Sequence, residues 1–94
     1  MQTREQLIYS ETGVQISLVG EPDASQVSVV VRAGASQLLT VVIARACVSR
    51  LTVALLEDWH VSGGDPAEEF RRLLIAHEIR FAPLDNWRPR EGLN

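Results

Sequence analysis

The chain has 94 residues, twelve acidic and nine basic side chains, a formal net charge of −3 and one cysteine. This length fits one domain. All nine basic residues are arginine, so a Schiff-base lysine and the Gly-Lys-Ser/Thr of a phosphate-binding loop are both excluded. A net negative charge without a basic block argues against nucleic acid as the partner.

The single thiol and the longest apolar stretch both favour a cytoplasmic protein. Cys47 stands alone between Ala46 and Val48, so no internal disulfide forms and an inert, buried thiol is expected. The first residues are polar and do not resemble a secretory leader. The apolar stretch 38–56 contains Arg45 and Arg50, which are costly inside a bilayer, so we expect it to be core and no membrane to be bound.

The first half of the chain predicts four strands. Gln6–Ser10 is a short apolar stretch, and apolar and polar residues alternate in Val14–Val19 and Val27–Arg32, with turn-forming residues between the three segments. Val30 breaks the alternation of the third segment, which predicts a buried position on its outer face. Leu38–Ala44 is apolar on both faces and is expected to be a fourth strand.

The second half predicts two helices. Helical spacing begins between Ala44 and Ser49, and Gly63-Gly64 is expected to end the first helix. The alternative is one long helix over Ser36–His60. Asp65 and Pro66 are a typical helix start.

The second helix is expected to run to about Glu78, and a short strand at Ile79–Ala82 would follow it. Its apolar positions recur at helical spacing. They are Phe70, Leu73, Leu74 and His77.

Strands first and helices afterwards indicate an α+β fold of order β-β-β-β-α-α-β. We expect one domain over residues 1–84, with an antiparallel sheet of about four strands, a fifth being optional. Two consecutive helices would pack on one face of this sheet. Residues 85–94 are predicted to be an irregular C-terminal arm.

Glu57, His60 and His77 are the candidate metal ligands. Glu57 and His60 share a helix face at i, i+3, and His77 would join them if the two helices pack antiparallel. The competing interpretation is that Glu57 and His60 lie in solvent at a helix end, and that His77 is a hydrogen-bonded, half-buried histidine. No nucleophile stands in a catalytic motif, and no cofactor is expected.

The arm contains Trp87 flanked by Arg88 and Arg90, a composition enriched in protein interfaces. These three residues are predicted to contact a partner or a second copy of the chain; alternatively, Trp87 folds back on its own domain. The sequence therefore predicts a small non-enzymatic protein-binding or regulatory protein of the inhibitor, immunity, chaperone or assembly type. A homodimer is expected, and the alternative is a small metal-dependent enzyme or metal-binding protein.

Overall fold

The computed structural model of the chain describes residues 3–11, 13–60 and 64–84. Four strands come first: β1 (Arg4–Glu11), β2 (Val14–Gly20), β3 (Gln26–Ala33) and β4 (Ser36–Ala44). They are followed by a 3₁₀ turn, two helices and a short strand: η1 (Arg45–Cys47), α1 (Val48–Asp58), α2 (Pro66–Ala76) and β5 (Ala82–Pro83).

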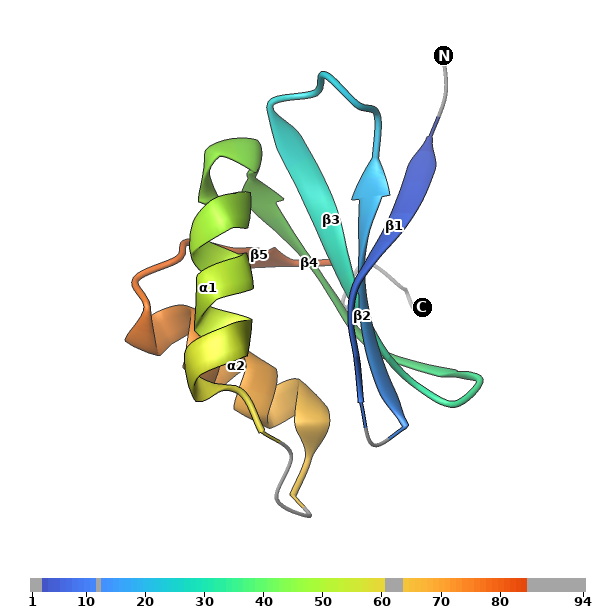
Figure 1. Ribbon diagram of the computed structural model, residues 1–94. Helices are drawn as coiled ribbons and strands as arrows, with labels where there is room; N and C mark the ends of the chain where they lie inside the picture. The colour runs from blue at the N-terminus through green and yellow to red at the C-terminus, as the bar shows by residue number, and fades with distance from the viewer. Residues whose placement is uncertain (1–2, 12, 61–63, 85–94) are drawn as a thin grey trace, which may run out of the picture.

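The strands form one antiparallel sheet in the order β1-β2-β3-β4-β5, so the first four pair with their neighbours along the chain. β5 returns after the helices and pairs with Val41 and Val42 of β4. α1 and α2 lie together on one side of the sheet (Figure 1). The predicted α+β architecture, with its optional fifth strand, is confirmed.

Two tight turns contain glycines in the left-handed backbone region, which L side chains rarely adopt. Gly13, between β1 and β2, has a φ of 81°, and Gly34, between β3 and β4, has a φ of 62°. The Gly34 amide donates to the Gly13 carbonyl at 3.3 Å. The two turns therefore lie together at one end of the sheet.

The chain changes from strand to helix after Ala44, so the single long helix over Ser36–His60 is wrong. The β-branched residues 40–43 are stiff at the first side-chain torsion and suit a pleated sheet. α1 begins at Val48 behind η1, so Ser49 lies inside the helix.

Arg45 fixes the point at which the chain leaves the sheet. Its Nε donates to the Ala24 carbonyl at 2.5 Å, and its Nη2 donates to the Glu21 carbonyl at 2.6 Å. The Arg45 amide donates to the Ser25 carbonyl at 2.8 Å. A planar guanidinium can bond several carbonyls at once, which explains why an arginine interrupts the apolar stretch.

α2 begins as predicted, because the Asp65 side chain accepts the Ala67 amide at 3.1 Å and Pro66 occupies the first turn. It ends at Ala76, earlier than predicted.

A Schellman motif causes this early end. Glu78 has a φ of 58°, and its amide donates to the Ile75 carbonyl at 3.1 Å. The Ile79 amide donates to the Leu74 carbonyl at 2.9 Å. Ile79 is buried in the core, so the fifth strand forms at Ala82–Pro83 instead of Ile79–Ala82.

The core lies between the sheet and the two helices. Trp59, which follows α1 and is 8% exposed, is part of it. Its ring makes edge-on contacts with Tyr9 (6.1 Å between centroids) and Phe70 (5.8 Å). No helix in the described ranges is long and apolar enough to span a bilayer.

Candidate functional site

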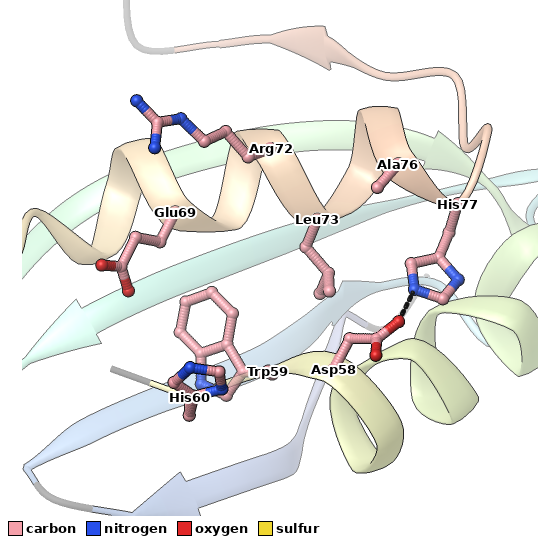
Figure 2. Close-up of a pocket in the computed structure, with 8 residues that line it drawn as sticks. All are labelled: Asp58, Trp59, His60, Glu69, Arg72, Leu73, Ala76 and His77. Atoms are coloured by element: carbon pink, nitrogen blue, oxygen red, sulfur yellow. Dashed lines mark hydrogen bonds and ion pairs between the residues drawn. The ribbon is translucent and has the colours of Figure 1, made fainter. Parts of the chain in front are cut away.

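A hollow of about 320 Å³ lies where the C-terminal end of α1 meets α2. Figure 2 shows the eight side chains that line it, with Trp59 and His60 on one side and α2 on the other. Its lining residues are Asp58, Trp59, His60, Glu69, Arg72, Leu73, Ala76 and His77. We call this hollow the interhelical pocket.

A histidine–carboxylate contact closes one end of the interhelical pocket. Nε2 of His77 lies 2.6 Å from Oδ2 of Asp58, and the two side chains are 22% and 59% exposed. The contact joins the last residue of α1 to the cap residue of α2. The second ring nitrogen of His77 points away from the other labelled side chains (Figure 2). The interpretation of His77 as a half-buried, hydrogen-bonded histidine is confirmed.

The structure assembles the candidate metal ligands only in part. His60 and His77 line the same pocket, but the carboxylate beside His77 belongs to Asp58, while Glu57 is exposed and outside the lining. No group of three or more His, Cys, Asp or Glu side chains suited to a metal ion occurs within residues 3–11, 13–60 and 64–84.

The chemistry available to the interhelical pocket is polar recognition. The described residues that line it include no hydroxyl or thiol nucleophile. Arg72, the only cation among these described residues apart from the histidines, directs Nε to the Glu68 carboxylate at 3.6 Å. The pocket is therefore lined by both acidic and basic groups, and this mixture does not favour a ligand of one charge.

A tyrosine on β1, Tyr9, contacts Trp59, one of the residues that line the pocket. The Tyr9 hydroxyl donates to Oε1 of Glu11 at 3.0 Å. Burial raises the pKa of Tyr9, and the neighbouring Glu11 carboxylate raises it further. The Trp59 indole N–H, which approaches the hydroxyl without reaching hydrogen-bond geometry, partly offsets this rise in pKa.

The other side of the sheet carries a row of side chains that crosses β1 to β4 and reaches Leu84, the residue directly after β5. We call this side, which faces away from α1 and α2, the open face. The strand register places Leu7, Ser17, Val30 and Thr40 opposite one another, and the Leu84 amide extends the row by donating to the Thr40 carbonyl at 2.8 Å. Opposed residues in antiparallel strands project to the same face.

Val30 is the apolar centre of this row. It is only 5% exposed, yet it is not among the buried residues that form the core cluster. The predicted buried position on the outer face is therefore confirmed. Its neighbours Ser17 and Thr40 are 3% and 9% exposed, so the middle of the open face is largely inaccessible to water.

An ion pair crosses the open face diagonally. Nη1 of Arg32 on β3 lies 2.7 Å from Oε2 of Glu5 on β1. On β2, Arg32 lies opposite Gln15 and Glu5 lies opposite Val19. The line from Arg32 to Glu5 therefore crosses β2 near Ser17, which is midway between Gln15 and Val19. The ion pair therefore crosses the row at Ser17, which is 3% exposed.

The predicted partner-binding residues Trp87, Arg88 and Arg90 lie outside the described residues. Cys47, expected to be buried, is half-buried and packs against the edge of the core. Sequence reasoning missed Asp58, because helical spacing does not reveal how two helices cross. For the open-face row, the only indication in the sequence is Val30, which breaks the alternation of its strand.

Comparison with known proteins finds no matching family model, no matching curated protein and no matching solved structure.

Proposed function

We propose that this chain is a small, non-enzymatic protein-binding or regulatory protein of the inhibitor, immunity, chaperone or assembly type. It engages its partner sterically with the sheet side of the molecule, through the open face and the arm of residues 85–94. Within the arm, Trp87, Arg88 and Arg90 supply the contacts.

The open-face row carries this proposal. It ends in two exposed leucines, Leu7 at 53% and Leu84 at 37%, and neither α1 nor α2 covers the strands between them. Because no helix lies on this side of the sheet, both leucines are accessible to a partner that docks on the open face. Leu84 is the last described residue, and the predicted partner-binding arm of residues 85–94 follows it in the sequence.

A homodimer and a cytoplasmic location belong to the same proposal. The outer edge of β1 has no neighbouring strand within the described part of the chain, and an unpaired edge is a template for a second copy. The single cysteine suits a reducing compartment.

Affinity capture from the source cells, followed by binding measurements with the purified partner, tests the proposal. Trp87→Ala should weaken binding by roughly 30-fold, the effect expected for an interface tryptophan worth about 2 kcal/mol. Leu56→Ala is the matched control, because Leu56 is 80% exposed but lies on α1. Unchanged affinity for Trp87→Ala, or equal loss in the control, would contradict the proposal.

A further inference from the structure

We infer that the chain binds a small organic acid, a carboxylate with an apolar body, in a cavity between the end of β4 and the segment that precedes β5. The cavity has a volume of about 480 Å³. Besides residues of β3 and β4, it is lined by Cys47 and Arg50 near the start of α1 and by Glu78, Arg80 and Phe81. We call it the β4-end pocket. The inference goes beyond the proposed function, because it concerns a small ligand and not a protein partner.

The β4-end pocket exists because β5 is too short to follow β4 to its end. The pairing of β5 with β4 is limited to Val41 and Val42, so the last residues of β4 lack a partner from β5. Before β5, the left-handed backbone at Glu78 turns the chain and Ile79 enters the core, where it is 3% exposed. The two residues between Ile79 and β5 therefore pass the end of β4 without pairing with it.

The floor of the β4-end pocket is apolar and continuous with the core. Ile43 is 1% exposed, and the half-buried Phe81 and Cys47 pack against the core cluster. Val42 adds further apolar surface to the lining. Sites for small molecules are typically concave and largely apolar, with volumes of about 300–1,000 Å³. Because core packing holds these side chains in place, the floor is preformed for the apolar body of a ligand.

Two exposed arginines line the β4-end pocket together. Nη1 of Arg50 lies 3.4 Å from the carbonyl oxygen of Glu78, which is two residues before Arg80. Neither arginine forms an ion pair with a carboxylate within the described part of the chain. The long bond from Arg50 leaves most of its five N–H donors available. An anion between the two guanidinium groups would lower their mutual repulsion and accept charge-assisted hydrogen bonds.

The charge balance of the β4-end pocket favours a ligand with one negative charge. Two guanidinium groups stand against one carboxylate, that of Glu78, among the described lining residues. The pocket therefore has an excess of one positive charge, although the whole chain has a net charge of −3. A planar carboxylate matches the fork of a guanidinium, and the amide of Gln26, which also lines the pocket, can donate to the same group. A monocarboxylate with an apolar body fits both the charge and the floor.

Isothermal titration calorimetry of the full chain with octanoate, below the concentration at which it forms micelles, tests the inference. Acetate lacks the apolar body and octan-1-ol lacks the charge, so each should bind at least about 10-fold more weakly than octanoate. Arg80→Gln should weaken octanoate binding roughly 10-fold, the effect of losing a charged hydrogen bond. Arg72→Gln is the matched control, because Arg72 is a 75% exposed arginine on α2 that does not line this cavity.

Cys47 reports where octanoate binds, because it is the single thiol and lines the β4-end pocket. Bound octanoate should slow the alkylation of Cys47 by iodoacetamide several-fold. Unfolding by octanoate would accelerate this reaction instead, so slowing cannot come from denaturation. Glu78→Gln should bind octanoate more tightly than the unmodified chain, because it removes the one carboxylate among the described lining residues.

Protection of Cys47, together with selective weakening by Arg80→Gln, would support the inference. Lack of octanoate binding, equal weakening by Arg72→Gln, equally tight binding of octan-1-ol, or binding that leaves Cys47 unprotected would each overturn it. Tighter binding of an apolar tripeptide with a free C-terminal carboxylate would also overturn it, in favour of the C-terminus of a protein. None of these measurements involves partner capture, so this inference and the proposed function can fail separately.

Discussion

Tyr9 links the stability of the protein to alkaline pH. Its pKa is raised from the ordinary value of 10.0 in the folded chain, chiefly by burial, so the folded state holds the phenolic proton more tightly than the unfolded chain. The resulting contribution to the free energy of unfolding is complete below pH 10.0. It is lost as the pH rises through the higher folded-state pKa.

Phenolate absorbance and urea unfolding, both followed from pH 8 to 12, check this prediction. Tyr9 is the single tyrosine and the chain has no lysine, so few other groups titrate in this window. Tyr9→Phe should flatten the alkaline loss of stability. A phenolate that titrates at pH 10.0 or below in the folded chain would show the prediction to be wrong.

Single side chains were predictable from the sequence when their surroundings are local. The cap at Asp65 was predictable because its carboxylate accepts a hydrogen bond from the amide of Ala67, only two residues along the chain. Asp58 was not predictable, because its partner His77 lies nineteen positions away and is brought close only by the crossing of α1 and α2. The sequence of α1 alone does not distinguish Glu57 from Asp58 as the carboxylate that contacts His77.

The end of α2 stores backbone strain that glycine would relieve. Glu78 is a non-glycine residue at a φ of 58°, the position in a Schellman motif where glycine is preferred. Glu78→Gly should stabilise the chain by up to about 1 kcal/mol, the cost of left-handed backbone less the added entropy of the unfolded chain. Thermal unfolding measures the change.

Glu78→Ala is the control for this prediction at α2. It removes the carboxylate but keeps a Cβ in the left-handed region, so it should give no stabilisation. If alanine and glycine stabilise equally, loss of the charge rather than relief of strain would be the cause.

Helices and strands with a clear hydrophobic periodicity were predicted correctly, but the positions at which they end were not. β4 and α1 follow from β-branched residues giving way to helical spacing after Ala44. The end of α2 was misplaced, because no glycine marks the turn at Glu78. β5 was misplaced with it, since Ile79 has the apolar character of a strand residue but its side chain completes the core.

For the whole molecule, the expected homodimer should form through the free edge of β1. Leu7 lies on that strand and is 53% exposed. Leu7→Lys should convert the dimer to a monomer in sedimentation experiments, because lysine on an edge strand discourages pairing between chains. Leu56→Lys, on α1, should remain dimeric. An unmodified chain that stays monomeric at every concentration would contradict this prediction.

The layered architecture could be predicted because each level of the sequence agrees with it: alternating strands come first and capped amphipathic helices come later. The open face could not be predicted as a surface. Which polar residues share it depends on the strand register, and the register includes irregularities between Leu7 and Tyr9 and between Val31 and Arg32. The Glu5–Arg32 ion pair, between residues 27 positions apart, arises from that register.

Because the order of strands in the sheet equals their order in the chain through β4, the sheet is synthesised before the helices that cover it. Residues 4–44 contain four strands that each pair with the one made just before, a local arrangement that forms quickly. The apolar side of this sheet has no cover until residues 48–76 emerge from the ribosome. At about 5–20 residues per second, the nascent chain presents a bare, adhesive sheet for a few seconds. We therefore expect any aggregation during translation to be greatest in that interval, before α2 is complete.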